Sequence, residues 1–216
     1  MGLIPPGTFS MGCSASNQYG CNSDETVHQV TLTQAFYLSR TEVTQAQWVA
    51  KMGSNPSYFT GDTSRPVEKV SWNDIQPFCT NNGLRLPTEA EWEYAYRAGT
   101  TTAFHGWTAN QSGTNDDNQL GTIAWFNSIG GSQTHPVGGK ASNGFGLFDM
   151  AGNVGEWVND WYGDYGSSAQ TNPTGPGSGS GRVLRGGGWQ SDRSDYCRAS
   201  YRTYNPPGSR YYLFGF

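Results

Sequence analysis

Residues 182–216 read RVLRGGGWQSDRSDYCRASYRTYNPPGSRYYLFGF, and they carry the most informative pattern in the chain. The segment Arg182–Arg185 is typical of a half-buried strand. In the run Gly186–Trp189 that follows, the glycines allow another backbone to pass closely. Beyond Trp189 the composition shifts to Tyr, Arg, Ser and Asp, and Tyr and Arg often contribute most of the binding energy at protein interfaces. We therefore predict a strand followed by an exposed contact surface, and we call residues 182–216 the C-terminal stretch.

The candidate ligand-binding residues are polar or aromatic side chains beyond the glycine run. They are Ser191, Asp192, Asp195, Tyr196, Tyr201, Tyr204, Ser209, Tyr211 and Tyr212. Among the aromatic residues, we expect Tyr196, Tyr211 and Tyr212 to be exposed and Trp189 and Phe214 to be core. The alternative interpretation is that about half of these aromatic side chains simply fill the core.

Length and composition restrict the class of protein. The chain has 216 residues, 14% of them aromatic, and 30 glycines. Disordered chains lack aromatic residues, so the low hydropathy indicates long loops around an aromatic core. The net charge of −4, without a run of like charges, argues against nucleic acid or an anionic membrane as a partner. No segment is long and apolar enough to span a bilayer. We therefore expect one α+β domain rich in loops.

The four cysteines do not match a zinc pattern. Cys13 and Cys21 stand at the ends of a short polar loop, where they either form a disulfide or remain free thiols, and export would favour the disulfide. Cys79 lies in an apolar helical segment and is predicted to be inert core. The sequence shows no recognisable signal peptide and therefore does not test whether the protein is exported. We expect an extracellular, cell-surface or periplasmic location.

Three segments predict helices. Gln45–Met52 follows Thr44, a candidate N-cap, and Asp74–Cys79 begins a second helix. The third helix starts with the sharpest local signal in the chain, a capping box of Thr88 and Glu91. We expect Glu89, Glu91 and Glu93 to stabilise the helix cap and the helix dipole rather than to act in catalysis.

Strands are predicted where short alternating segments are bounded by turn formers. These segments are Pro5–Gly12, Val27–Leu32, Ala35–Arg40 and Pro66–Trp72, in addition to Arg182–Arg185. Residues 100–142 are rich in Gly, Asn and Thr and are predicted to form long loops. We expect His105 and His135 there to be hydrogen-bonded loop residues rather than ligands or bases.

The segment Gly146–Trp157 places two carboxylates, Asp149 and Glu156, on either side of a bend that contains glycine. Their oxygens and the intervening carbonyls could converge as the all-oxygen ligand set that calcium prefers. The alternative is an ordinary turn with a solvated Asp and a capped Glu, and the spacing alone favours it.

Motifs along the whole chain resemble one family, the formylglycine-generating enzyme or sulfatase-modifying factor domain. In chain order they are Pro6–Gly12, Thr41–Thr44, Pro66–Val67, Val70–Trp72, Leu84–Ala95, Gly146–Trp157 and Arg185–Gly187. The resemblance implies a single α+β domain over residues 1–216 with a C-type-lectin-like core. That core consists of a small twisted antiparallel sheet, two main helices and many long loops.

The resemblance also bears on metals. It implies a structural calcium ion held by the side chains of Asp149 and Glu156 and the carbonyls of Gly152 and Val154. The family's oxidases hold copper(I) between two cysteines after the Gly-Gly motif, and copper(I) requires soft thiolates. In this chain the first matching position is Ser191, and the second falls at or near Tyr196. The single thiol of Cys197 aligns better with a structural cysteine of the family. We therefore expect no copper and no oxidase activity.

These features predict a non-catalytic module that binds a protein or a glycan through the C-terminal stretch. The ending also resembles the variable proteins of diversity-generating retroelements, in which adenine-directed mutagenesis yields Tyr, Ser, Asp and Gly at surface positions. The alternative is a formylglycine-generating oxidase, or a divergent relative, that acts on a substrate cysteine. A third hypothesis is a domain that regulates or accompanies a partner protein.

Overall fold

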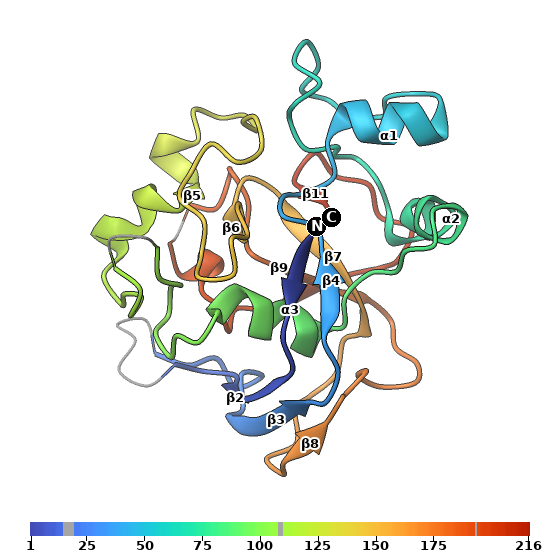
Figure 1. Cartoon of the computed structure of the whole chain (residues 1–216). Coiled ribbons are helices and arrows are strands. Elements are labelled where there is room, and N and C mark those ends of the chain that lie inside the picture. The colour runs from blue at the N-terminus through green and yellow to red at the C-terminus, as the bar shows by residue number, and fades with distance from the viewer. Residues whose placement is uncertain (15–19, 108–109, 193) are drawn as a thin grey trace.

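The computed structural model describes residues 1–14, 20–107, 110–192 and 194–216, and it is a single α+β domain (Figure 1). Its described part contains three α-helices: α1 (Gln45–Met52), α2 (Trp72–Asn81) and α3 (Glu89–Arg97). Short 3₁₀ turns occur at η1 (Asp117–Thr122), η2 (Asn127–Ile129) and η3 (Ser194–Cys197). None of the described helices is long and apolar enough to cross a membrane.

Each α-helix begins with a capping box, in which the N-cap and the third helical residue satisfy each other's backbone N–H groups. The pairs are Thr44 with Gln47, Ser71 with Asp74, and Thr88 with Glu91. The predicted caps of α1 and α3 are therefore confirmed. The second helix begins two residues earlier than predicted because Ser71 is its cap.

The central sheet has the strand order β10–β9–β7–β11. Its strands are β7 (Gly155–Trp161), β9 (Arg182–Arg185), β10 (Thr203–Asn205) and β11 (Phe214–Gly215). The pairs β7–β9 and β9–β10 are antiparallel, whereas β11 runs parallel to β7. The sheet is thus mixed rather than purely antiparallel, because the chain crosses over before its last strand.

The remaining strands form smaller sheets. They are β1 (Gly2–Ile4) with β4 (Phe36–Leu38); β2 (Gly7–Met11) with β3 (His28–Leu32) and β8 (Gln170–Thr171); and β5 (Ala124–Trp125) with β6 (Ala151–Gly152). The strand predicted over Pro66–Trp72 is wrong. Pro66 makes only an isolated bridge to Thr44, and the chain then turns at Lys69, whose φ is +58°.

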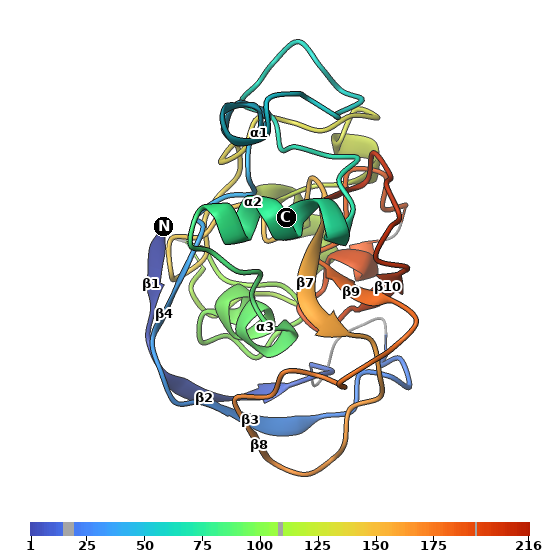
Figure 2. The same cartoon turned by 90° about the vertical axis from the view of Figure 1, so that its right-hand side faces the viewer.

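Aromatic residues fill the core, as the composition predicted. Helix α3 lies between the β2–β3–β8 sheet and the central sheet (Figure 2). It buries Trp92 and Tyr96 in one hydrophobic cluster with Phe104. In a second cluster Trp48 stacks on Phe78 of α2.

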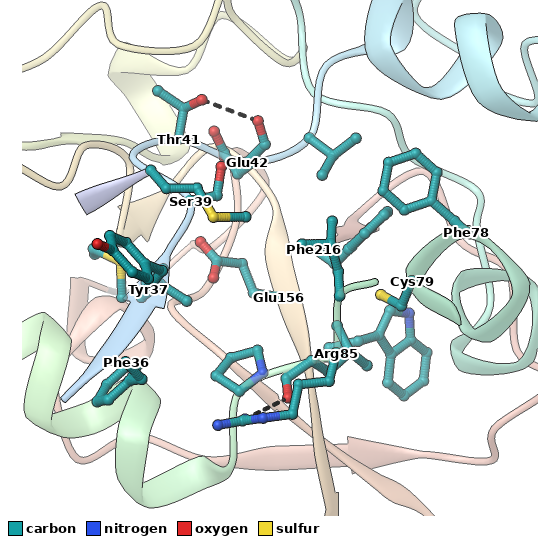
Figure 3. Close-up of a pocket in the computed structure, with 18 of the residues that line it drawn as sticks. Phe36, Tyr37, Ser39, Thr41, Glu42, Phe78, Cys79, Arg85, Glu156 and Phe216 are labelled. Carbon is teal, nitrogen blue, oxygen red and sulfur yellow. Dashed lines mark hydrogen bonds between the residues drawn. The ribbon is translucent and has the colours of Figure 1, made fainter. Parts of the chain in front are cut away.

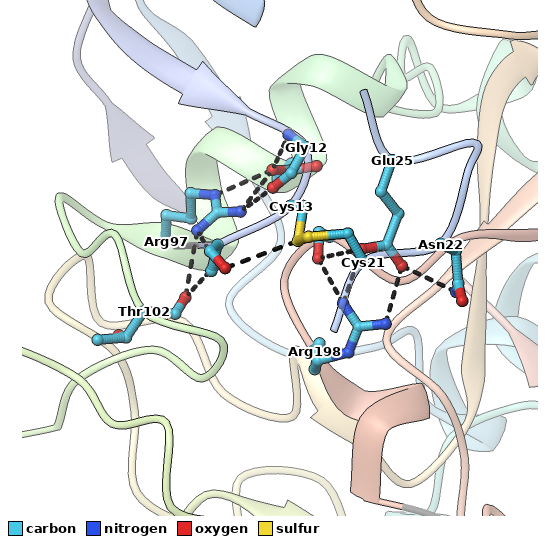
Figure 4. Close-up of a disulfide and its surroundings, with 11 residues drawn as sticks. Gly12, Cys13, Cys21, Asn22, Glu25, Arg97, Thr102 and Arg198 are labelled. Atoms are coloured by element: carbon cyan, nitrogen blue, oxygen red, sulfur yellow. Dashed lines mark hydrogen bonds and ion pairs between the residues drawn. A yellow bond between two sulfur atoms is a disulfide. The ribbon is translucent and has the colours of Figure 1, made fainter. Parts of the chain in front are cut away.

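Cys13 and Cys21 form a disulfide, which decides between the two states that the sequence left open (Figure 4). Residues 15–19 of the loop between them lie outside the described residues. Two buried ion pairs flank the disulfide, Arg198 with Glu25 at 2.7 Å and Arg97 with Glu93 at 2.8 Å. Cys79 is a buried free thiol, as predicted, and burial raises its pKa to about 11.

Candidate ligand-binding site

A pocket of about 520 Å³ opens over β9, the glycine run and η3, and we call it the C-terminal pocket. All of its lining residues except Asn127 and Gly155 come from the C-terminal stretch. Its volume lies within the range of pockets that bind small ligands or side chains of a partner. The segment that the sequence marked as a contact surface therefore encloses a cavity.

The glycine run forms the floor of this pocket. Gly186 and Gly187 have φ values of +86° and +67°, a region that favours glycine. A Cβ on Gly187 would lie 2.8 Å from the carbonyl oxygen of Tyr196 and 3.0 Å from Ser191 Oγ. Such distances are too short for a side chain. The close approach predicted for these glycines is confirmed.

Four of the predicted ligand-binding residues line the C-terminal pocket: Ser191, Asp192, Tyr196 and Tyr201. Ser191 Oγ accepts a hydrogen bond from the Gly188 N–H at 2.9 Å, which fixes the turn after the glycines. The rings of Tyr196 and Tyr201 pack together with their centroids 4.8 Å apart. Asp192 is exposed. Hydroxyl, carboxylate and aromatic groups therefore converge on one cavity.

Two further predicted residues, Tyr211 and Tyr212, lie beside the pocket and are 50% and 38% exposed. Tyr211 packs edge-on against Phe214, which lines the pocket, and Tyr212 stacks on Trp189. Trp189 is buried, as predicted, whereas Phe214, predicted to be core, and Tyr196, predicted to be exposed, are both half-buried. The exposed aromatic surface continues onto Tyr58, whose ring centroid is 5.5 Å from that of Tyr212.

The other three predicted residues do not line the pocket. Tyr204 lies on β10 and stacks on Tyr162, with the ring centroids 4.3 Å apart. Asp195 is buried within η3. Ser209 lies in a turn and donates its backbone N–H to the carbonyl of Pro206. Similar residue types along one stretch thus have different positions in the fold.

The thiol nearest the C-terminal pocket is unsuited to copper(I). Cys197 Sγ lies 3.1 Å from the point that a Cβ on Gly187 would occupy, close to Ser191 Oγ. Cys197 is buried, and burial raises its pKa to about 12, with the charge of Asp195 adding to the effect. It is therefore a thiol, not a thiolate, at neutral pH. The other cysteines are the Cys13–Cys21 disulfide and Cys79 on α2, so the residues present do not fit a two-thiolate copper centre.

A buried ionic network lies behind the pocket floor. Arg185 pairs with Glu93 at 2.6 Å and with Glu89 at 3.2 Å, and Arg202 pairs with Glu89 at 2.7 Å. The cap and dipole role assigned to the helix acids holds for Glu91, which caps α3, and for the first-turn position of Glu89, but it is wrong for Glu93. Both Glu89 and Glu93 are buried and pair with Arg185, which is distant in the sequence.

The two histidines of the loop region are hydrogen-bonded, as expected. His105 is buried and bonds through Nδ1 to the Gly106 carbonyl, and burial lowers its pKa to about 4. His135 bonds through Nε2 to the Gly130 carbonyl and stacks on Trp125.

The predicted calcium ligands extend from Asp149, just before β6, through Gly152 at the end of β6 and Val154 in the bend, to Glu156 at the start of β7. Asp149 is buried with φ +57°; its Oδ2 accepts the Gly138 N–H at 2.5 Å, while Oδ1 has no hydrogen-bond partner. Glu156 Oε2 accepts the Trp92 indole N–H at 2.7 Å, and burial raises the pKa of Glu156 to about 7. An orphaned buried carboxylate oxygen suits a hard cation, so the donor chemistry fits calcium. The carbonyls of Gly152 and Val154 would have to supply the further oxygens.

A third buried carboxylate, Glu42, lies close enough to affect this pair. Burial raises its pKa well above the usual value, and the charges of Asp149 and Glu156 raise it further. Neither Glu42 carboxylate oxygen has a hydrogen-bond partner of good geometry. In the described part of the chain, however, no three His, Cys, Asp or Glu side chains are arranged to enclose a metal ion.

The mixed sheet, the capped helices and the long loops define a C-type-lectin-like scaffold, and the C-terminal pocket is a cavity on this scaffold. The family model of the sulfatase-modifying factor enzyme 1-like domain matches residues 1–216, and the chain belongs to this family. It is 31% identical to the formylglycine-generating enzyme of Streptomyces coelicolor, a match that covers 99% of this chain and 86% of that enzyme. It is 35% identical to the formylglycine-generating enzyme of Mus musculus over 88% of this chain, and it spans 52% of that relative.

The solved structure of Treponema denticola variable protein 1 has the same fold, with a TM-score of 0.87. The two proteins are 35% identical over 100% of this chain and 92% of that one. Both resemblances read from the sequence, to the enzyme family and to a variable protein, therefore have counterparts among known proteins.

Sequence reasoning missed several residues at these sites. Asn127 lines the C-terminal pocket and Tyr58 extends its aromatic surroundings, yet both come from segments distant in the sequence and carry no local signal. Glu42 was part of a recognised motif without an assigned role. The available clue was an acid next to the apolar Val43, which is half-buried against the second hydrophobic cluster.

Proposed function

We propose that this protein is a non-catalytic binding module that holds a protein or glycan ligand in the C-terminal pocket. The single observation that carries the proposal is the convergence of Ser191, Asp192, Tyr196 and Tyr201 on one cavity with a rigid glycine floor. Tyrosine offers a flat apolar face and a polar tip at a low cost in side-chain entropy, and Ser and Asp add adaptable hydrogen bonds.

The surroundings of the pocket favour a macromolecular or glycan ligand over a deeply enclosed small molecule. Tyr58, Tyr211 and Tyr212 are exposed next to the cavity. Exposed aromatic rings beside a cavity are typical of surfaces that receive another protein or stack on a sugar. A ligand that enters the pocket could therefore also bury these rings.

The similarity to Treponema denticola variable protein 1 supports a finer proposal, that the pocket residues are the positions that vary between alleles. The framework behind them is held by buried arginines. Sequencing closely related alleles tests this proposal. We expect substitutions at Ser191, Asp192, Tyr196 and Tyr201, with Arg185 and Gly187 constant. Substitutions spread evenly along the chain would contradict it.

The alternative function is that of a formylglycine-generating oxidase, and membership of the family supports it. The chemistry of the pocket argues against it, because Ser191 occupies one of the two positions that should carry a thiolate and Cys197 is a buried thiol.

A structural calcium ion is also proposed, bound by Asp149 and Glu156 with the carbonyls of Gly152 and Val154. The unpartnered Oδ1 of Asp149 supports it. Calcium would hold the bend that leads into β7, so its role would be to stabilise the scaffold rather than to contact the ligand.

The binding proposal is tested with three variants on a printed glycan array and a displayed protein-fragment library. Asp192→Ala and Tyr196→Ala remove side chains that line the pocket, while Tyr204→Ala is the matched control on β10. Ligands retained by the wild type should bind about tenfold or more weakly to the two pocket variants and normally to the control. Ligands that bind all three variants equally would contradict a site in this pocket.

A further inference from the structure

A second cavity, of about 370 Å³, opens between β4, α2 and β7 (Figure 3). Its two carboxylates, Glu42 and Glu156, interact with Asp149 and belong to the region of the proposed calcium site. This cavity shares no lining residue with the C-terminal pocket. The disulfide between Cys13 and Cys21, in contrast, is connected to the wall of the C-terminal pocket by a chain of hydrogen bonds and an ion pair.

Glu25 is the residue through which the disulfide reaches the pocket (Figure 4). It is 1% exposed, and Asn22, the residue after Cys21, donates its side-chain N–H to Glu25 Oε1 at 3.0 Å. Cys13 donates its backbone N–H to the Glu25 carbonyl at 2.9 Å. Because these contacts come from both ends of the disulfide, the covalent bond ties together the two segments that hold Glu25.

The Glu25 carboxylate in turn holds Arg198. Arg198 Nη1 donates to Glu25 Oε2 at 2.7 Å and Nη2 donates to Oε1 at 2.8 Å, and both side chains are almost fully buried. Ser200 Oγ lies 2.9 Å from the same Oε2. Among the described residues, Glu25 is the only acid paired with Arg198, whereas Arg185 pairs with two. A buried arginine with a single acid is left uncompensated when that acid moves.

Arg198 directly follows the wall of the C-terminal pocket that η3 forms. Its backbone N–H donates to the Asp195 carbonyl at 3.2 Å, and its carbonyl accepts the Tyr201 N–H at 3.2 Å. Tyr196 and Tyr201, on either side of Arg198 in the sequence, both line the pocket, and their rings pack together. The position of the Arg198 guanidinium therefore affects the backbone that carries both rings.

The disulfide can be reached by an external thiol from one side, because Cys21 is exposed whereas Cys13 is only 8% exposed. A thiolate of a dithiol attacks Cys21 Sγ, forms a mixed disulfide and releases Cys13 as a thiolate that takes up a proton. The second thiolate of the dithiol then closes a cyclic disulfide and releases Cys21, which is protonated in the same way. Two electrons and two protons thus pass from the dithiol to the two cysteines.

We propose that the Cys13–Cys21 disulfide is a redox switch for the C-terminal pocket, and that Glu25 is the positioning residue that transmits its state through Arg198 to the two pocket tyrosines. With the disulfide intact, Glu25 is held against Arg198 and the pocket wall is ordered. Reduction frees the segment that carries Glu25 and loosens the wall. This regulation rests on the proposed function, because it acts on the same pocket.

Hydrogen–deuterium exchange of the whole protein, before and after treatment with dithiothreitol, tests the switch, and iodoacetamide labelling of Cys13 and Cys21 confirms the reduction. We expect the backbone amides of residues 194–202 to exchange about tenfold or more faster after reduction, with α1 and β7 unchanged. Unchanged exchange at residues 194–202 would overturn the proposal. So would equal acceleration in all segments, which indicates a disulfide that only stabilises the whole fold, or a disulfide that resists dithiothreitol in the folded protein.

Two variants test the role of Glu25. Glu25→Gln keeps the disulfide but removes the charge that pairs with Arg198, so residues 194–202 should exchange fast even in the oxidised protein. Asn22→Ala, at an exposed position, removes one donor to Glu25 and should accelerate exchange less, which keeps the test available if Glu25→Gln does not fold. Asp164→Asn is the exposed control with the same change in charge as Glu25→Gln and should exchange like the wild type. Wild-type exchange at residues 194–202 in either Glu25→Gln or Asn22→Ala would overturn the role of Glu25.

Reversibility separates a switch from damage to the fold. Reoxidation of the reduced wild type with oxidised glutathione should restore slow exchange at residues 194–202. The double variant Cys13→Ser, Cys21→Ser should exchange fast there with or without dithiothreitol, and a double variant as slow as the oxidised wild type would overturn the proposal. Because none of these measurements uses a ligand, their failure would leave the binding proposal standing.

Discussion

The C-terminal stretch contains two sets of side chains, which differ in direction and in role. The inward set consists of Arg185, Arg198 and Arg202, which are almost fully buried and paired with acids from distant segments. The outward set consists of Ser191, Asp192, Tyr196 and Tyr201, which line the C-terminal pocket. One segment can thus hold the scaffold together and present a contact surface, because different residues perform the two tasks.

The difference shows how such a surface can change without loss of the fold. The arginines fix the path of the backbone through ion pairs and hydrogen bonds to main-chain carbonyls, as in the bonds from Arg185 to the carbonyls of Ala199 and Ser200. In the outward set, Ser191 also fixes the turn after the glycines, whereas Asp192 is exposed. Substitutions in the inward set should therefore affect stability, and substitutions in the outward set should affect binding.

The largest loss of unfolding free energy is expected for Arg185→Gln. Removing Arg185 leaves the buried acids Glu89 and Glu93 with only their second partners, Arg202 and Arg97, and the loss of one member of a buried ion pair typically costs about 3–5 kcal/mol of unfolding free energy. Arg210→Gln is the matched control, because Arg210 pairs with Asp74 at the surface and its loss should change the unfolding free energy far less. Urea denaturation measures both, and equal costs would contradict the division into two sets.

The buried framework should also make the stability of the protein depend on pH, through Asp160. The pKa of Asp160 is raised to about 7 by burial, and the charges of Glu89 and Glu91 add to the rise. Because the folded pKa lies above the unfolded one, this contribution to stability is fully present below about pH 4 and is lost as the pH rises through about 7. Between about pH 4 and pH 8, the unfolding free energy of the wild type should therefore fall by on the order of 3 kcal/mol relative to that of Asp160→Asn.

Urea unfolding at a series of pH values checks this prediction. The exposed Asp164→Asn variant has the same change in charge and should follow the wild type at every pH. If Asp160→Asn also follows the wild type, Asp160 is ionised in the folded protein without penalty and the prediction is wrong.

Calcium should stabilise the scaffold and not the contact surface. A ligand that binds only the folded state at about one hundred times its Kd stabilises that state by about 2.7 kcal/mol. We expect EDTA to lower the Tm of the wild type, and Asp149→Asn to remove this sensitivity while tolerating the positive φ at that position. Differential scanning calorimetry measures both. A wild type that does not respond to the chelator would rule out the calcium site.

The smallest change in unfolding free energy is expected for substitutions in the outward set. Asp192 is exposed, and only its backbone carbonyl is seen to accept a hydrogen bond, from Asn127. Asp192→Ala should therefore change the unfolding free energy by less than about 0.5 kcal/mol. A loss comparable to that of Arg185→Gln would show that the pocket residues also belong to the framework.

The parts of the fold that depend on local chemistry were predictable from the sequence. The caps of α1 and α3 are short patterns in which each residue interacts with a neighbour three positions away. The special role of the glycines was also visible, because few other residues adopt a positive φ. Composition alone pointed to Ser191 and Tyr196 as contact residues.

Features that depend on distant contacts were not predictable. Glu93 and Arg185 are 92 positions apart, and the sequence shows only an acid on a helix and an arginine at the end of a strand. Glu42 interacts with Asp149 and Glu156, which are distant in the sequence, so its position next to Val43 was a weak clue to these surroundings. Tyr204 and Tyr201 look equivalent in the sequence, and only the pairing of β10 with β9 separates them.

A copper(I) titration combined with a peptide oxidation assay tests most directly whether the C-terminal pocket is a contact surface rather than a redox centre. The wild type should bind no copper(I) in the pocket and should leave the cysteine of a Cys-X-Pro-X-Arg peptide unchanged, whereas the double variant Ser191→Cys, Tyr196→Cys should gain copper(I) binding. A wild-type protein that holds stoichiometric copper between two sulfur ligands, or that converts the peptide cysteine to an aldehyde, would contradict the account.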